Sequence, residues 1–202
     1  MNHPVRFLLV DDHPLFRQGL ASVIENVRRY SVTAEATTIS QALSLLESIE
    51  VDVALVDISL QQENGLELVK TLKATRPEIS CIVVSMYDEI IYASSALKAG
   101  AKGYVMKQEA ASSLLDAIDQ VLKGKIYLSK DMRERMLDTM LLQDSREEID
   151  PVKLLSIREM EVLRLLGQGF GVSEIAHNLN LSVKTINVYR DNIRRKLSID
   201  DA

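Results

Sequence analysis

Residues 51–57 read Val-Asp-Val-Ala-Leu-Val-Asp, an apolar, β-branched run that ends in an aspartate. Similar runs predict further strands at residues 5–10, 31–36, 79–85 and 103–105. Amphipathic stretches predict helices at residues 16–27, 41–48, 65–74 and 112–122, with another that ends at Gly100. Ser40 is the expected N-cap of the second helix. Short apolar strands that alternate with helices indicate an α/β fold, a doubly wound five-stranded parallel sheet covered on both faces.

Residues 1–124 hold all of these strands and form the first predicted domain. Residues 125–150 follow as a linker, because a single amphipathic stretch at 132–142 leads into a polar run at 143–148 and then Pro151. The chain is therefore expected to place a second domain after this linker.

Residues 151–202 predict a small all-α domain. Ser156 and Glu159 have the spacing of a capping box at the start of its first helix. A second helix is expected at residues 173–180, and a third is capped by Ser182. Three short helices with tight turns make a small helical domain, and periodicity alone is equally compatible with an interaction module that has a solvated basic face.

Charge divides the chain in the same way. Residues 1–124 carry 11 Lys and Arg against 16 Asp and Glu, whereas residues 151–202 carry 8 against 6.

Apolar runs stay well short of the roughly 20 residues that span a bilayer, and the first residues lack the pattern of a signal peptide. The single cysteine, Cys81, lies in an apolar run and fits a buried strand. We therefore expect a cytoplasmic protein with no membrane partner.

Polar side chains follow the predicted strands where a doubly wound sheet binds its ligands. Asp11 and Asp12 follow the first strand, Asp57 follows the third, Ser85 ends the fourth, and Lys107 follows the fifth. Clustered carboxylates favour a hard divalent cation such as Mg²⁺. An aspartate can itself accept a phosphoryl group, whose oxygens a lysine and a hydroxyl would then bind. Taken singly, each residue is an ordinary surface feature; together they indicate a phosphoryl site.

This set resembles the receiver domain of two-component signalling, in particular the NarL/FixJ class. The resemblance rests on residues 9–17 (Leu-Val-Asp-Asp-His-Pro-Leu-Phe-Arg), Asp57, Ser85 and residues 104–107 (Tyr-Val-Met-Lys). It implies a flavodoxin-like receiver in which Asp57 takes phosphate from a phosphohistidine on a sensor histidine kinase. The implied Mg²⁺ ligands are Asp12 and Asp57 directly, Asp11 through water and Ser59 through its backbone carbonyl. Ser85 would contact the phosphoryl group, Lys107 would pair with it, and Tyr104 would be the switch aromatic.

Two positions depart from the pattern of that family. Gln61 stands where a proline is common, and Gln108 stands where many receivers have a proline after the lysine. Gly65, eight residues after the acceptor, is the glycine usual at this position. These departures bear on the geometry of the loops rather than on the chemistry of the pocket.

Residues 155–163, 174–176, 184–186 and 196–197 resemble the LuxR-type helix-turn-helix. The resemblance implies that the third helix enters the major groove. The residues expected to face DNA are Lys184, Thr185, Asn187, Val188, Arg190, Asp191, Arg194 and Arg195. Asn187 can read adenine, and Asp191 can accept from cytosine but repels phosphates. Since no further helix is predicted after residue 197, either the sequence is part of a longer chain or the receiver provides the dimer contacts.

The leading hypothesis is a response regulator in which phosphorylation of Asp57 controls dimerisation and binding to double-stranded DNA, and so transcription. The protein would be a phosphoacceptor, able to autodephosphorylate, and not an enzyme. Asn187 and Asp191 motivate a second hypothesis, a phospho-regulated adaptor whose DNA binding is weak or lost. A third, an aspartyl-phosphate hydrolase, lacks the usual second aspartate because Ser59 stands there. A nucleotide-binding flavodoxin-like domain is disfavoured because no glycine-rich phosphate loop follows the first strand.

Overall fold

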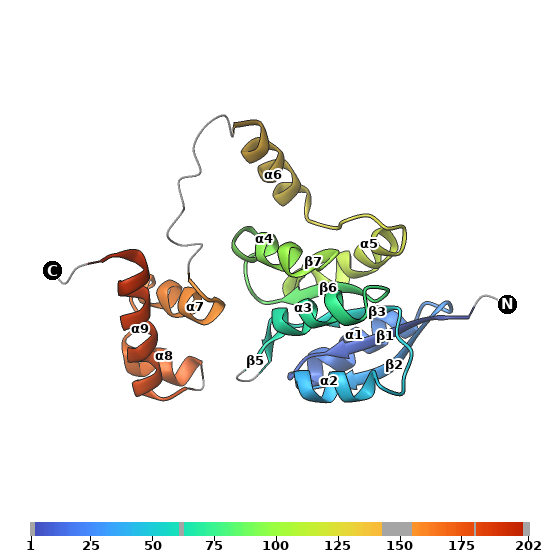
Figure 1. Ribbon diagram of the computed structural model, residues 1–202, viewed down its shortest axis with the longest axis horizontal. Coiled ribbons are helices and arrows are strands. Elements are labelled where there is room, and N and C mark those ends of the chain that lie inside the picture. Colours follow the sequence, from blue (N-terminus) through green and yellow to red (C-terminus); the bar gives the residue numbers. More distant parts are fainter. Residues whose placement is uncertain (1–2, 61–62, 143–154, 180, 200–202) are drawn as a thin grey trace. The chain divides into compact units, whose positions relative to one another are not determined.

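A five-stranded parallel sheet forms the centre of the first of two compact units, Met1–Leu142 and Gln143–Ala202. The computed structural model describes residues 3–60, 63–142, 155–179 and 181–199 (Figure 1). The strand order is β2-β1-β3-β6-β7. The bounds are β1 (Val5–Val10), β2 (Tyr30–Ala36), β3 (Val53–Val56), β6 (Ser80–Ser85) and β7 (Gly103–Met106). The predicted doubly wound α/β sheet is confirmed.

Helices cover both faces of the sheet, as right-handed crossovers between parallel strands require (Figure 1). α1 (Pro14–Glu25) and α5 (Ala110–Leu122) pack together on one face. The opposite face carries α2 (Ile39–Leu45), α3 (Gly65–Thr75) and α4 (Glu89–Ala99). A short 3₁₀ helix, η1 (Lys107–Glu109), joins β7 to α5, and α6 (Lys130–Leu142) ends the unit.

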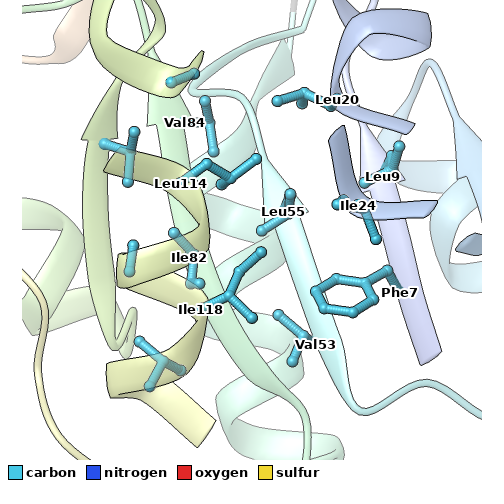
Figure 2. Packing of buried hydrophobic residues seen from close by; sticks show 14 of the residues in the cluster. Phe7, Leu9, Leu20, Ile24, Val53, Leu55, Ile82, Val84, Leu114 and Ile118 are labelled. Atoms are coloured by element: carbon cyan, nitrogen blue, oxygen red, sulfur yellow. The ribbon is translucent and has the colours of Figure 1, made fainter. Parts of the chain in front are cut away.

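The core beneath α1 and α5 explains the apolar strands. Figure 2 shows Phe7 and Leu9 of β1 pointing toward Ile24 of α1, with Leu55 and Ile118 in the same layer. The alternate residues of β1 are buried just as completely on the other face. Because helices cover both faces of the central strands, β3 and β6 are apolar and buried almost throughout, whereas the edge strand β2 keeps the exposed Glu35.

Two local features differ from the sequence-based expectation. α2 begins after Thr38, whose side chain accepts a hydrogen bond from the Gln41 amide, so the prediction of Ser40 as N-cap was wrong. Either hydroxyl can cap a helix, and the earlier one captures the free amides here. A small antiparallel pair, β4 (Ser59–Leu60) and β5 (Glu63–Asn64), also follows Asp57.

The second unit contains α7 (Ile157–Gly167), α8 (Val172–Asn178) and α9 (Val183–Leu197). Their core is built from Val162, Leu165, Ile175, Ala176, Ile186 and Ile193. The capping box of Ser156 and Glu159 is confirmed. Over the described residues, the two units include no helix long and apolar enough to cross a membrane.

Candidate phosphoryl pocket and nucleic-acid interface

Asp11 and Asp57 lie side by side at the carboxyl edge of the sheet because β1 and β3 are neighbours there. Their strands pair in register up to Val10 and Val56, and the Asp57 amide donates to the Val10 carbonyl at 2.9 Å. The chain runs from β1 outward to β2 and then back past β1 to β3, so the strand order reverses at this point. Both carboxylates are almost completely buried, with 2% and 3% exposure. The pocket is therefore at the switch point at which doubly wound sheets bind ligands.

The Lys107 ammonium lies between the two carboxylates. Its Nζ is 2.7 Å from Asp57 Oδ2 and 2.7 Å from Asp11 Oδ2, and it stands 4.5 Å above the centroid of the Phe16 ring. Lys107 reaches this place from η1, directly after the edge strand β7, which β6 separates from β3. The ammonium thus holds the position at which a cation or the oxygens of a phosphoryl group would be bound.

Burial raises the pKa of Asp57 to about 6, although the Lys107 charge and hydrogen bond oppose this shift. The nearby Asp11 carboxylate adds to the increase, and the Ser59 amide, which donates to Asp57 Oδ1 at 3.2 Å, reduces it. Asp57 is therefore ionised at neutral pH, but its charged form is held in an environment that penalises it. Such a carboxylate is a reactive oxygen nucleophile toward an electrophile that enters the pocket.

The acidic pocket has a donor set that fits a divalent cation. One ligand atom from each of Asp11, Asp12, His13 and Asp57 lies within 4.8 Å of the others. At that spacing, groups can share an ion directly or through water, and an oxygen-rich set suits Mg²⁺. The His13 side chain is 65% exposed, yet its Nδ1 lies 2.8 Å from Asp12 Oδ1 and 3.3 Å from Asp11 Oδ1, so it also borders the pocket.

Ser85 and Tyr104 are both fully buried near the ends of β6 and β7. The Tyr87 amide donates to Ser85 Oγ at 3.3 Å, and the Tyr104 hydroxyl donates to the Tyr87 carbonyl at 2.9 Å. Burial raises the pKa of Tyr104 well above its ordinary value, so its hydroxyl stays protonated as a donor. The predicted switch aromatic is thus already turned inward and tied to the loop that follows Ser85.

The loop after Asp57 is held close to the acceptor. Ser59 pairs with Asn64 in the β4–β5 register, and Gly65 donates its amide to the Ile58 carbonyl at 2.8 Å. A Cβ on Gly65 would lie 1.8 Å from the Asp57 carbonyl oxygen, so no larger residue fits at the start of α3. Gln61, one of the departures from the family pattern, lies outside the described residues.

α9 presents the predicted DNA-contacting residues on its solvent side. Ile186 and Ile193 point into the core of the unit, whereas Lys184, Asn187, Val188, Asp191, Arg194 and Arg195 are exposed. Thr185 and Arg190 are half-buried. Arg190 donates to Asn187 at 3.3 Å, which orders two members of this face. The spacing of the exposed set gives one continuous stripe along the helix.

The first helix of the unit is fastened to the end of α9. Glu159 Oε2 accepts from the Ser156 amide and from Lys196 Nζ, both at 2.6 Å. Burial alone would raise the pKa of Glu159, but these hydrogen bonds outweigh it and lower the pKa. The ion pair therefore fixes α9 against α7 at neutral pH.

Both units correspond to known families. Residues 7–119 match the response regulator receiver domain, and residues 153–202 match the bacterial regulatory proteins of the luxR family. The chain belongs to the NarL/FixJ class of response regulators. The response regulator UvrY of Escherichia coli (strain K12) is 31% identical over 195 residues, which cover 96% of this chain and 88% of UvrY. The oxygen regulatory protein NreC of Staphylococcus aureus (strain JH9) is also 31% identical, with 96% and 92% covered.

Solved structures show the same architecture in related regulators. RcsB of Salmonella typhimurium is 29% identical with a TM-score of 0.62, and the alignment covers 100% of this chain and 95% of RcsB. An RcsB–DNA complex is 28% identical with a TM-score of 0.61, covering 99% and 95%. This response regulator therefore combines a receiver with a LuxR-type DNA-binding domain that regulates transcription.

Substitution of Gly65 tests how tightly the acceptor is held. Gly65→Ala should lower the free energy of unfolding of the first unit by about 1–3 kcal/mol, because the new methyl group displaces the Asp57 backbone. Urea unfolding followed by tyrosine fluorescence measures it, since five of the six tyrosines, all but Tyr189, belong to this unit. Gly19→Ala is the matched control: a Cβ there would meet no described atom within 4 Å, so this exposed helical position should be neutral or gain up to about 1 kcal/mol. Equal effects would contradict the proposed constraint.

The raised pKa of Asp57 predicts a specific pH dependence of the metal-free protein. Because the folded state binds this proton more tightly than the unfolded chain, the stabilisation is present below about pH 4 and is lost as pH rises through about 6. Relative to Asp57→Asn, the wild type should lose up to about 3 kcal/mol across that window. Urea unfolding in EDTA at several pH values measures the difference, and parallel curves for the two proteins would refute it.

Proposed function

We propose that Asp57 is the phosphoacceptor, that Mg²⁺ assists the transfer, and that phosphorylation of Asp57 controls dimerisation and DNA binding. The observation that carries the proposal is the buried Asp57 carboxylate with a raised pKa, 2.7 Å from Lys107 Nζ at the switch point of the sheet. The phosphoryl donor would be a phosphohistidine of a sensor histidine kinase. A carboxylate oxygen attacks phosphorus, the P–N bond breaks as the P–O bond forms, and the imidazole leaves with the bonding electrons and takes up a proton.

Each residue of the pocket has a task in that transfer. Asp11, Asp12 and Asp57, with the Ser59 carbonyl, would hold Mg²⁺, which when bound offsets negative charge on the phosphoryl oxygens. Lys107 would exchange its contact with Asp57 for one with the transferred group, since an ammonium pairs with either anion. Ser85 Oγ would donate to a phosphoryl oxygen. Asp57 acts here as an acceptor that releases phosphate by slow hydrolysis, and no other enzymatic activity is proposed.

The relatives support a dimeric, DNA-bound active form. One solved structure contains two RcsB dimers bound to two parallel DNAs, and it is 28% identical to this chain with a TM-score of 0.62. By analogy, phosphorylation of Asp57 would shift the equilibrium between monomer and dimer toward a dimer whose two α9 stripes meet successive major grooves. The cytoplasm, where kinase and DNA are both accessible, is the proposed location.

Intact mass after treatment with acetyl phosphate and Mg²⁺ tests the acceptor. Wild type should gain one phosphoryl adduct and Asp57→Asn none, while Asp116→Asn, the same change on an exposed residue of α5, should behave as wild type. Beryllofluoride with Mg²⁺ should convert wild type, but not Asp57→Asn, from monomer to dimer by light scattering. An adduct that persists in Asp57→Asn would assign the chemistry to another residue.

Asp191 provides the test of the DNA-binding face. Asp191→Lys should raise the affinity for duplex DNA and steepen the plot of log K against log salt by about 0.9 per added phosphate contact. Asp116→Lys makes the same charge change on the first unit and should leave the slope nearly unchanged. If neither the wild type nor Asp191→Lys shifts DNA at low salt, the adaptor hypothesis, which the exposed Asp191 favours, replaces DNA binding.

A further inference from the structure

The chain after α5 returns to the sheet and lies along its edge strand, β7. The Tyr127 amide donates to the Lys102 carbonyl at 2.8 Å, and the Tyr104 amide donates to the Tyr127 carbonyl at 3.1 Å. Tyr127 thereby forms a parallel bridge with Gly103. The start of the segment that leads toward the second unit is therefore hydrogen-bonded directly to the strand that carries the switch aromatic.

A buried carboxylate fixes the next turn of this segment. Glu89, in the first turn of α4, is only 5% exposed, and its Oε1 accepts from the Ser129 amide at 2.9 Å. Ser129 in turn begins α6: its Oγ accepts from the Met132 amide at 3.1 Å. Leu128 and Met132 are buried on either side. Because this hydrogen bond from a backbone amide to a carboxyl oxygen is shielded from water, it holds the two groups in a fixed orientation.

These contacts close a ring with the phosphoryl pocket. Tyr104 uses its hydroxyl to hold the Tyr87 carbonyl and its amide to hold the Tyr127 carbonyl. The Tyr87 amide is bound to Ser85 Oγ, and the loop from Ser85 leads within four residues to Glu89. A movement of Ser85 toward a phosphoryl group would therefore be passed to Tyr87, to the α4 N-terminus, or to both.

We propose that Glu89 is a positioning residue that couples the phosphoryl pocket to the start of α6 through the Ser129 amide. The inference rests on the proposed function, because phosphorylation of Asp57 is what would move Ser85. In the unphosphorylated state Glu89 holds residues 127–132 against β7. Rearrangement of the loop after Ser85 changes the Glu89–Ser129 contact, and with it how firmly α6 is anchored to the receiver.

Four variants of the full-length protein separate the hydrogen bond from general packing. Glu89→Ala removes the acceptor, whereas Glu89→Gln keeps an oxygen in the same place and should rescue it in part. Ser129→Pro removes the donor amide and Ser129→Ala does not, although both remove the hydroxyl cap of Met132. The difference between the two Ser129 variants therefore reports the Glu89–Ser129 bond even if Glu89→Ala folds poorly.

The measurement is hydrogen exchange of residues 126–136, with and without beryllofluoride and Mg²⁺, together with DNA affinity in both states. Without beryllofluoride, Glu89→Ala and Ser129→Pro should exchange at least about tenfold faster in this segment than wild type, and Glu89→Gln and Ser129→Ala less so. Exchange in β1 and β3 should be unchanged, which verifies the fold. Beryllofluoride should alter exchange in the segment and DNA affinity in wild type and Glu89→Gln, and neither in Glu89→Ala.

Three results would overturn the inference. If Glu89→Ala and Ser129→Pro exchange at the same rate as the wild type, the Glu89–Ser129 contact does not anchor the segment. Faster exchange with an undiminished effect of beryllofluoride on DNA affinity would reduce Glu89 to a structural role. If beryllofluoride does not change hydrogen exchange in the wild-type protein, although that protein still forms the Asp57 adduct, the coupling is rejected and the assignment of Asp57 as phosphoacceptor stands. Loss of the adduct itself would instead identify failure of the proposed function.

Discussion

The ammonium of Lys107 between Asp11 and Asp57 is the interaction on which the carboxyl edge of the sheet depends. Two carboxylates that repel each other are both withdrawn from water, and each would be costly to bury without a cation. The lysine offsets that cost from one side, while His13 lies against Asp11 and Asp12 on the other. Because Lys107 comes from the strand end farthest in sequence from Asp11, the pocket exists only when β1, β3 and β7 occupy one sheet.

Lys107 offsets the cost of burying the Asp57 charge only in part, and this matters for what the carboxylate can bind. The pKa of Asp57 stays raised despite the ammonium, because burial outweighs it. A perfectly neutralised carboxylate would be a stable structural ion pair with little reason to exchange partners. In the proposed function, a carboxylate that is penalised in its charged form would gain from a bound metal ion or from phosphorylation, which changes its charge and its contacts. The stability that the metal-free receiver loses at this residue would then be the source of the proposed response.

The sequence predicted the periodic parts of the molecule and missed those set by single hydrogen bonds. The apolar runs located all five strands of the sheet because burial on both faces leaves a continuous signal, and the capping box of Ser156 was confirmed. Thr38 was missed as a cap because several hydroxyls near it are chemically equivalent candidates. The return of Tyr127 to β7 left no periodic trace, since one residue with two backbone bonds suffices. His13 beside the acidic pocket was within reach of the sequence, because it directly follows Asp12, but its orientation depends on the turn into α1.

The two units use charge in opposite ways, and this difference bears on what each one binds. In the receiver, the buried Lys107 offsets the charges of Asp11 and Asp57 only in part, so a small cation or a transferred group can still enter their network. In the second unit, α9 contributes Ile186 and Ile193 to the core, Tyr189 and Leu197 pack against it, and Lys196 fastens the helix to α7. None of these contacts accounts for the exposed stripe that includes Lys184, Asn187 and Arg194. Exposed polar side chains on one helix can contact an external polyanion. Asp191 lies in the middle of that stripe. Its charge lowers non-specific attraction to phosphates, so that base contacts must supply a larger share of the binding energy.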